Sequence, residues 1–265
     1  MNLPATELIL SNQSKILEAL KGVGSTRKFF SEEYADTLWI GRQAFWRTFG
    51  KVHCMPWFEI GAMQSPIDYL AYAECILQKR PRVVVEMGTA SGAAAMFYVE
   101  ALKRVHRDDN VRVITVEYQP SQISYGISSY PNIFSIIGNS VDPEIVKKVY
   151  RLAEEVDGPV MVTLDSDHSA QHVSREIGSY ADLVSKGQYL IVQDTYLGLY
   201  WGGNLDREMM VEFFEGHPDR KFDYTGSPLG AVEALLSCDD RFKVDLHPQR
   251  WILTQCPFGF LLRER

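Results

Sequence analysis

Acidic and amide side chains follow two short apolar runs in the second half of the chain. The run 160–164 is followed by Asp165, and the run 189–192 is followed by Gln193 and Asp194. Carboxylate and amide oxygens are the ligands that Mg²⁺ prefers, with waters and substrate oxygens completing its shell. A metal in such a site lowers the pKa of a bound hydroxyl. We therefore expect Asp165, Gln193 and Asp194 to hold Mg²⁺.

A histidine lies in the same polar segment. His168 comes three residues after Asp165, and His172 follows one helical turn later. A neutral imidazole can remove a hydroxyl proton near pH 7, so we expect His168 and Asp165 to be the catalytic residues. Two alternatives remain open. Asp165 or Asp167 could cap the helix expected near residue 170, and His168 could serve as a cap or a core hydrogen-bonding residue.

The segment 83–92 predicts a strand, a glycine turn and the start of a helix. Gly88 permits a sharp turn and a close approach of a ligand to the backbone, and the helix start presents unpaired N–H groups. Many doubly wound folds contain such a turn. Here the third glycine of the dinucleotide motif GxGxxG is missing, and Glu86 precedes the glycines, where a carboxylate can hold the amino group of a methionine moiety. The segment therefore favours S-adenosylmethionine over a dinucleotide.

Polar residues also follow the next two apolar runs. Glu117 follows the run 111–116 and can bind both hydroxyls of a ribose, whereas Asn139 and Ser140 follow the run 133–137, near where an adenine would lie. The alternative is a doubly wound fold whose glycines serve packing alone. The full set of expected cofactor-binding residues is Glu86, Gly88, Thr89, Ser91, Gly92, Glu117, Asn139, Ser140 and Asp165.

These motifs must be positioned by a sheet. From residue 82, the apolar runs 83–85, 111–116, 133–137, 160–164 and 189–192 alternate with helical stretches at 90–105, 142–155 and 170–185. Unbroken apolar strands with helices between them are typical of a parallel sheet that is covered on both faces. The runs 242–246 and 258–262 have no helix between them and predict an antiparallel pair. We expect an α/β fold, a doubly wound, mostly parallel sheet closed by a C-terminal antiparallel hairpin.

Residues 1–80 are expected to form an N-terminal helical extension to a domain that spans 81–265. Apolar residues recur at helical spacing near the N-terminus and over 33–48, and a third helix begins at Ser65-Pro66 and ends before Pro81. An insertion at 196–227 opens with aromatic residues beside glycines. We expect it to be a lid or a substrate wall, the alternative being an oligomer contact.

Composition excludes several function classes. The 265 residues carry a net charge of -7 and no cluster of Lys and Arg, so we expect no nucleic-acid partner. The four cysteines form no CxxC pair, which argues against a zinc knuckle or a redox dithiol. No signal peptide is recognisable, and no apolar stretch reaches the roughly 18 residues needed to cross a bilayer. We expect a soluble cytoplasmic protein without a membrane partner, acting on a small molecule.

Five segments together resemble the cephalosporin hydroxylase and rhamnosyl O-methyltransferase family of class I methyltransferases. The resemblance runs from about Trp46 to the end of the chain. It implies the class I methyltransferase fold, S-adenosylmethionine near Glu86, Gly88 and Glu117, and a hydroxyl acceptor on a natural product or its sugar. The segments are Ser65-Pro66-Ile67-Asp68, Val85-Glu86-Met87-Gly88-Thr89, Leu164-Asp165-Ser166-Asp167-His168, Gln193-Asp194-Thr195 and the closing run 255–263.

The resemblance also implies Mg²⁺ at Asp165, Gln193 and Asp194, with His168 where the similar catechol-type methyltransferases place a lysine base. Two features depart from the family: Gln193 stands where members usually carry Glu, and the insertion at 196–227 is longer than usual. We further expect a homo-oligomer and a role in natural-product or antibiotic biosynthesis.

Two other functions compete with O-methylation. Hydroxylation, which the family label suggests, is disfavoured because no set of two His and one carboxylate is evident to hold iron. A non-catalytic cofactor-binding subunit is disfavoured because acids occupy four strand ends, at Glu86, Glu117, Asp165 and Asp194.

Overall fold

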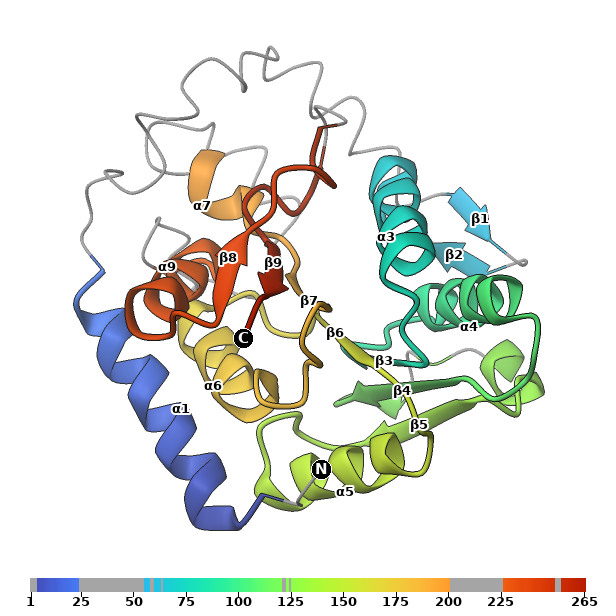
Figure 1. The fold of residues 1–265 in the computed structure, drawn as a ribbon, viewed down its shortest axis with the longest axis horizontal. Helices are drawn as coiled ribbons and strands as arrows, with labels where there is room; N and C mark the ends of the chain where they lie inside the picture. The colour runs from blue at the N-terminus through green and yellow to red at the C-terminus, as the bar shows by residue number, and fades with distance from the viewer. Residues whose placement is uncertain are drawn as a thin grey trace.

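A computed structural model describes residues 4–23, 55–57, 60–62, 64–120, 123, 125–200, 226–250 and 254–265. In this part of the chain, seven strands form one sheet in the order β5-β4-β3-β6-β7-β9-β8 (Figure 1). Strands β3 to β7 pair in parallel, whereas β9 pairs antiparallel with both β7 and β8. The strands are β3 (Val83–Met87), β4 (Arg112–Glu117), β5 (Ile133–Ile137), β6 (Val160–Leu164), β7 (Tyr189–Val192), β8 (Phe242–Val244) and β9 (Phe260–Arg263). The predicted mostly parallel sheet with a C-terminal antiparallel pair is confirmed.

Helices cover both faces of the sheet. One face packs against α3 and α4, and the other against α5, α6 and α9, with α1 lying outside α6 and α9. Side chains alternate between the two faces along each strand: Val83 and Val85 enter the core on the α5 side, and Val84 enters the core on the α3 side. The helices are α1 (Thr6–Lys21), α3 (Pro66–Lys79), α4 (Ala93–His106), α5 (Pro143–Glu154), α6 (Ala170–Tyr180), α7 (Tyr196–Tyr200) and α9 (Pro228–Cys238), with a 3₁₀ turn η3 (Tyr125–Ser129).

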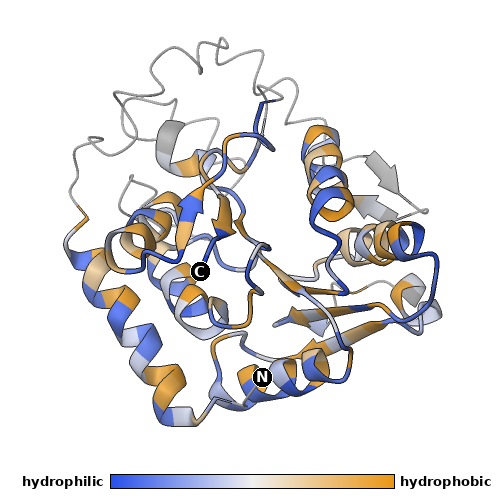
Figure 2. Ribbon diagram, viewed as in Figure 1, coloured by the Kyte–Doolittle hydropathy of each residue, from blue (hydrophilic) through white to orange (hydrophobic). Residues whose placement is uncertain are grey.

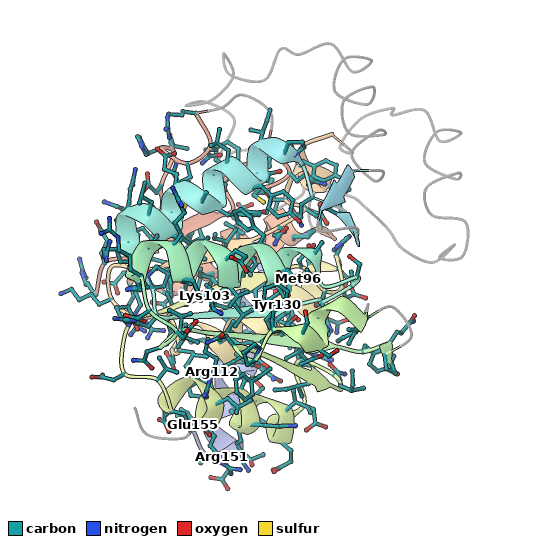
Figure 3. All side chains as sticks on the ribbon, turned by 90° about the vertical axis from the view of Figure 1, so that its right-hand side faces the viewer. Met96, Lys103, Arg112, Tyr130, Arg151 and Glu155 are labelled. Carbon is teal, nitrogen blue, oxygen red and sulfur yellow. The ribbon has the colours of Figure 1, made fainter. Side chains whose placement is uncertain are left out.

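The strands are apolar because both of their faces are covered. All five residues of β3 and of β6 are buried, and the hydropathy colouring shows the central strands as mostly hydrophobic (Figure 2). At the β5 side of the sheet, Arg112 donates to Glu155 over 2.7 Å and ties the start of β4 to the end of α5 (Figure 3). Because β3 to β7 are parallel, their carboxyl ends all lie at the same edge of the sheet.

Gly88 lies where the two halves of the sheet meet. The chain runs from β3 outward through β4 and β5 and then returns to β6 on the other side of β3, so the carboxyl ends of β3 and β6 form the switch point where doubly wound folds bind ligands. Gly88 has φ +92, and a Cβ there would lie 1.9 Å from the backbone oxygen of Asp165. Only glycine fits this turn, because it needs both the left-handed conformation and the close approach.

Helix α3 begins as predicted. The hydroxyl of Ser65 accepts from the N–H of Ile67 over 3.2 Å, Pro66 occupies the first turn, and the helix ends at Arg80 before Pro81. This start places Gln64 beside the strand ends.

The structure differs from the sequence prediction in four places. Residues 1–80 are not all helical, because β1 (Met55–Trp57) and β2 (Ile60–Ala62) form an antiparallel pair; Pro56 and Gly61 both disfavour a helix interior. Helix α9 was not expected, because most of its residues are apolar and buried and it has only a weak amphipathic stripe. The helix predicted over 170–185 ends at Tyr180, and the insertion at 196–227 opens with the helix α7.

Two predicted features lie outside the described residues, namely the helix over 33–48 and the part of the insertion at 201–225. Among the described residues, no helix is both long and apolar enough to span a membrane. The division at residue 80 stays a prediction, as does a lid at 196–227.

Candidate functional site

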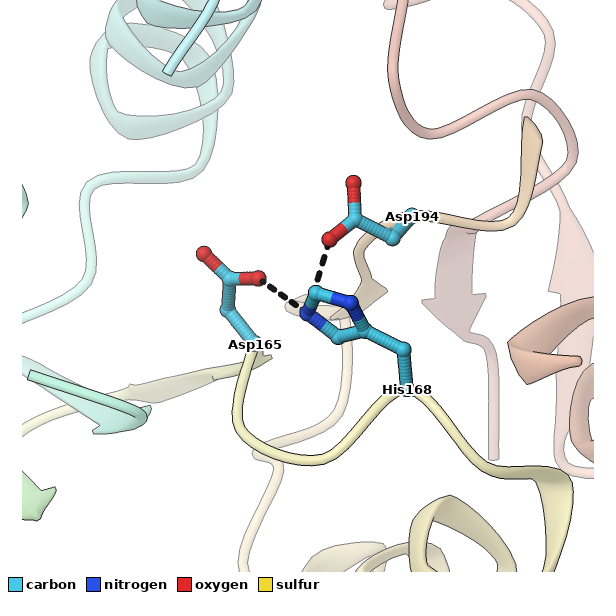
Figure 4. A group of neighbouring side chains, drawn as sticks. All are labelled: Asp165, His168 and Asp194. Carbon is cyan, nitrogen blue, oxygen red and sulfur yellow. Dashed lines mark ion pairs between the residues drawn. The ribbon is translucent and has the colours of Figure 1, made fainter. Parts of the chain in front are cut away.

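The ends of β6 and β7 bring two carboxylates and one imidazole together. His168 Nε2 lies 2.8 Å from Asp194 Oδ2 and 3.5 Å from Asp165 Oδ1 (Figure 4). One ligand atom from each of the three residues falls within 4.8 Å of the others, close enough to hold a metal ion. Asp194 holds φ +53, a left-handed conformation that non-glycine residues adopt mainly where the surrounding structure enforces it.

The two carboxylates decide the charge of His168. Burial alone would lower the pKa of the imidazole, but Asp194 and Asp165 outweigh that effect and raise the pKa well above its ordinary value. Burial raises the pKa of Asp165, to about 6, against the opposing effect of its hydrogen bond with His168. Without a metal, the two carboxylates thus favour the imidazolium form of His168, whereas its proposed role as a base needs the neutral ring.

Asp165 does not cap α6. The N-cap of this helix is Ser169, whose hydroxyl accepts from the N–H of His172 over 3.3 Å. Asp167 supports the same turn by accepting from the N–H of Ser169 over 2.8 Å. Asp165 instead contacts His168 and Gln64, so capping does not explain it.

Gln193 joins the cluster through a residue that the sequence analysis missed. The amide nitrogen Nε2 of Gln64 donates to Asp165 Oδ2 over 2.7 Å and also to Gln193 Oε1. The other end of Gln193 donates to Thr163 Oγ1 over 2.8 Å, so its oxygen faces Gln64 and Asp165. The only sequence signal for Gln64 was its place directly before the Ser65-Pro66 helix start.

Asp68 is a second residue to which the sequence analysis gave no role in the site. Asp68 is buried, and it accepts from Thr254 Oγ1 over 2.5 Å and from the N–H of Gln255 over 2.9 Å. Burial raises the pKa of Asp68 to about 7, although both hydrogen bonds oppose that shift. Asp68 thereby fixes the start of α3 to the segment that precedes β9.

Glu86 ends β3 as a buried carboxyl. Thr115 Oγ1 donates to Glu86 Oε2 over 2.6 Å, and the hydroxyl of Thr89 lies 2.6 Å from that of Thr115. Burial raises the pKa of Glu86 to about 8, against the effect of the Thr115 hydrogen bond. A cationic group brought against Glu86 would favour its ionised form.

Glu117 lies on the neighbouring strand end and is held by the backbone. Its Oε2 accepts from the N–H of Ala90 over 2.9 Å, and its Oε1 accepts from the N–H of Gln119 over 2.8 Å. The turn between Gly88 and α4 thus packs directly on this carboxylate. Gly92, with φ +89, completes the turn, and Ser91 donates to the backbone oxygen of Gly61 over 2.8 Å.

Asn139 and Ser140 are not brought into contact with this group. Ser140 Oγ lies 2.5 Å from Glu176 Oε1 and 3.1 Å from His172 Nε2, so both Ser140 and His172 face a buried carboxylate of α6. Asn139 Oδ1 accepts from the N–H of Val141 over 3.2 Å. His172 therefore does not point toward His168.

The donor set suits an oxygen-preferring divalent cation. Asp165 and Asp194 lie together, and Gln64 bridges the oxygens of Asp165 and Gln193. A carboxylate or amide oxygen that accepts one hydrogen bond keeps a further lone pair for a cation. In the described part of the chain, Asp165 and Asp194 form no ion pair with Lys or Arg. A cation would meet the negative charge of both carboxylates there, in competition with His168.

Comparison with known proteins gives one consistent family. The family model described as Rhamnosyl O-methyltransferase/CmcI matches residues 50–264. The Rhamnosyl O-methyltransferase of Mycobacterium bovis is 27% identical over 210 residues, which are 77% of this chain and 76% of the relative. That of Mycobacterium leprae is 29% identical over 141 residues, covering 53% of this chain and 60% of the relative.

A solved structure of CmcI in its apo form shares the fold. It matches 80% of this chain and 76% of its own with a TM-score of 0.56 at 18% identity, which confirms the class I methyltransferase fold. Given a family match over residues 50–264 together with this fold, the chain belongs to the Rhamnosyl O-methyltransferase/CmcI family.

Proposed function

We propose that this protein transfers the methyl group of S-adenosylmethionine to a hydroxyl of a small molecule, a natural product or its sugar, with the help of Mg²⁺. Family membership and the names of the Mycobacterium relatives support methyl transfer to oxygen. A second CmcI structure, with a TM-score of 0.53 at 18% identity, is named for Mg and SAM and supports both cofactors.

One observation carries the proposal. Asp165, His168 and Asp194 converge at the carboxyl ends of β6 and β7, and Asp165 touches the Gly88 turn. This puts the acid–base groups directly beside the place where the fold binds a cofactor. A methyl donor and a hydroxyl acceptor can then meet at a single strand edge.

The cofactor would lie along the ends of β3, β4 and β5. Glu117, fixed by two backbone N–H groups, is placed to accept from ribose hydroxyls. Glu86 would accept from the amino group of the methionine moiety, and the backbone between Gly88 and Gly92 would lie against the ligand. Asn139 and Ser140 belong to the end nearest the adenine.

In the reaction, the acceptor oxygen forms a bond to the methyl carbon while the carbon–sulfur bond breaks. The electron pair stays on sulfur, which turns the sulfonium into a thioether, and the hydroxyl proton moves to a base. Bound Mg²⁺ would offset the charge of the carboxylates, favour the neutral form of His168 and acidify the hydroxyl. His168 would then accept the proton on its other ring nitrogen, Nδ1, because Nε2 lies 2.8 Å from Asp194 and keeps its own proton toward that carboxylate. Asp194 would thereby orient the ring and stabilise the imidazolium that forms.

Hydroxylation is not favoured by the site. The metal-binding group in the described residues contains one His and two carboxylates, whereas the iron site of oxygenases uses two His and one carboxylate. Cytoplasmic location, homo-oligomer formation and a role in antibiotic biosynthesis stay predictions.

The test is methyl transfer from radiolabelled S-adenosylmethionine to a panel of sugar, alkyl and phenolic hydroxyls, with and without Mg²⁺. We expect label in a hydroxyl-bearing acceptor and loss of transfer after EDTA treatment. Calorimetry with S-adenosylmethionine alone serves as the control for cofactor binding. Full transfer after EDTA would refute the metal, and absence of cofactor binding would refute the methyltransferase activity.

A further inference from the structure

Gln64 occupies a position between two of the expected metal ligands. It is 7% exposed, and its single amide nitrogen donates to both Asp165 Oδ2 and Gln193 Oε1. An amide NH₂ group has two hydrogens, so both bonds can form at once. The oxygens of Asp165 and Gln193 carry like partial charges and would repel each other without this donor between them.

Tyr72 fixes the orientation of the Gln64 amide. Its oxygen accepts from the hydroxyl of Tyr72 over 3.3 Å, and that hydroxyl lies 3.2 Å from the buried thiol of Cys256. A flipped amide would turn its oxygen toward Asp165 and Gln193 and lose both bonds. The nitrogen of Gln64 therefore faces the site in one defined orientation.

Gln193 is fixed in the same way from the opposite side, because its nitrogen donates to Thr163 Oγ1 over 2.8 Å. An unbroken series of contacts thus runs from Thr163 on β6 through Gln193 and Gln64 to Tyr72 on α3. Gln193 has no charge with which to attract a cation, so its contribution depends on where its oxygen dipole points. That direction is set by Gln64 and Thr163.

We propose that Gln64 is the positioning residue of the metal site, holding the oxygens of Asp165 and Gln193 together so that both face one cation. The inference rests on the proposed function in so far as the site binds a divalent metal. Gln64 acts through the ligands and does not touch the reacting atoms. Removing such a supporting partner costs metal sites about 10- to 100-fold in affinity.

The experiment measures Mn²⁺ binding by the full-length protein, with the free ion followed by electron paramagnetic resonance. Mn²⁺ takes the same oxygen-rich octahedral sites as Mg²⁺. For Gln64→Leu, which removes the amide at similar volume, we expect the Kd for Mn²⁺ to rise about 10- to 100-fold. The affinity for S-adenosylhomocysteine, measured by calorimetry, should stay within about twofold, because Glu86 and Glu117, the expected contacts of the amino group and the ribose, lie on other strand ends.

Gln13 provides a matched control within the same chain. It is also 7% exposed, and its amide nitrogen also donates to two acceptors, Ser179 Oγ at 2.8 Å and the backbone oxygen of Val141 at 3.1 Å. Gln13→Leu should lower stability as Gln64→Leu does, yet leave Mn²⁺ affinity unchanged. An equal loss of Mn²⁺ affinity in both variants would reduce Gln64 to a general structural role and overturn the proposal.

A double-mutant cycle tests whether Gln64 acts through its ligand. If Gln64 positions Gln193, the Mn²⁺ affinity lost in Gln64→Leu combined with Gln193→Ala should be smaller than the sum of the two single losses. Strict additivity would show that Gln64 does not act through Gln193. Unchanged Mn²⁺ affinity in Gln64→Leu would refute the inference outright.

Tyr72→Phe covers the case in which Gln64→Leu does not fold. It keeps the ring and removes only the hydroxyl that orients Gln64, so we expect weaker Mn²⁺ binding with S-adenosylhomocysteine binding retained; unchanged Mn²⁺ affinity there would refute the inference. Wild-type protein that binds S-adenosylhomocysteine but no Mn²⁺ would refute the metal in the proposed function and this inference with it. Wild-type protein that binds Mn²⁺ but no S-adenosylhomocysteine would refute the methyltransferase proposal alone.

Discussion

Asp165 and Asp194 approach the ring of His168 at 3.5 and 2.8 Å and stabilise its cationic form. A base that is already protonated cannot accept another proton, so catalysis needs something that shifts His168 toward the neutral state. A divalent cation on the same carboxylates has that effect, because it competes with the imidazolium for their negative charge. The site therefore links metal binding to the availability of the base.

Replacing His168 tests that role. His168→Ala should lower kcat by about 10²- to 10⁴-fold, the usual contribution of a general base, while the affinity for S-adenosylmethionine stays close to that of the wild type. His168→Gln is the matched control, because it can still hydrogen-bond to Asp194 without transferring a proton at neutral pH. Steady-state kinetics and calorimetry give the two quantities. Full activity in either variant would leave proximity as the main catalytic effect.

Replacing Glu117 tests the cofactor end. Glu117→Ala should weaken S-adenosylmethionine binding by about 1.5–3 kcal/mol, the usual size of hydrogen bonds to a charged group. Glu117→Gln should lose less of the binding free energy, since its amide oxygen can still accept from the N–H of Ala90. In the wild type, that N–H donates to Glu117 over 2.9 Å. Calorimetry measures the affinity of both variants for S-adenosylmethionine. Wild-type affinity in Glu117→Ala would mean that the ribose lies elsewhere.

At the scale of elements, the turn at Gly88 packs against the backbone of Asp165, which follows β6. This contact keeps the ends of β3 and β6 together. Gly187, which precedes β7, is a natural comparison: its φ is +81, but a Cβ there would meet nothing within 4 Å. Gly187→Ala should therefore cost only the left-handed conformation, about 1–2 kcal/mol. Gly88→Ala should cost more, because its Cβ would also clash with the Asp165 backbone 1.9 Å away.

Urea denaturation measures the free energy of unfolding of both glycine variants. The difference between them isolates the steric contact from the backbone strain. Equal destabilisation would mean that the loops after β3 and β6 separate easily. In that case Asp165 would not be held rigidly beside the cofactor.

Elements that follow a strict local pattern could be predicted from the sequence. The apolar runs β3 to β7 and the Ser65-Pro66 helix start carry their own signals, and the predicted methyltransferase family is confirmed. Helix α9 was missed because a helix that is mostly apolar and mostly buried shows little periodicity. The gathering of Asp165, His168 and Asp194 followed from their places at neighbouring strand ends.

The remaining site residues depend on contacts that no local pattern reveals. Gln64 bonds to Asp165 across 101 positions, and Asp68 bonds to Thr254 across 186. The rise in the pKa of His168 also depends on the distances from its ring to both carboxylates, which the sequence does not contain. The hydrogen bond of Ser140 to Glu176 likewise joins residues 36 positions apart.

At the scale of the whole molecule, acidic side chains are concentrated at one edge of the sheet. The chain has a net charge of -7, and in its described part Asp68, Glu86, Asp165 and Asp194 form no ion pair with Lys or Arg. The cationic side chains pair elsewhere, as Arg112 does with Glu155 and Arg241 with Asp239. The carboxyl edge is therefore left with His168 as its nearest positive charge.

Because these acidic groups are buried, the free energy of unfolding depends on pH. Burial raises the pKa of Asp68 from 3.8 to about 7 and that of Glu86 from 4.5 to about 8. Both carboxyls bind a proton more tightly in the folded state, so the free energy of unfolding falls as the pH rises between those values. The raised pKa of His168 acts in the same direction, since its stabilising contribution is complete below pH 6.5 and is lost as the pH rises through the folded value.

We therefore expect the free energy of unfolding to fall from pH 5 to pH 8, by at most about 1.4 kcal/mol per pH unit for each proton involved. Mg²⁺ should restore stability at pH 8 and have little effect at pH 5, because it binds the ionised carboxylates and only the folded state gathers them. Urea denaturation at both pH values, with and without Mg²⁺ at constant ionic strength, measures both effects.

Two variants separate the causes. Asp68→Asn should flatten the dependence on pH while keeping the response to Mg²⁺, because Asp68 is bonded to Thr254 and Gln255 and lies behind the ligands. Asp165→Asn should lose the response to Mg²⁺ because it removes a ligand charge. A flat pH profile in the wild type would show that these carboxyls are solvated in the folded protein. A Mg²⁺ response that survives in Asp165→Asn would move the metal away from the ends of β6 and β7.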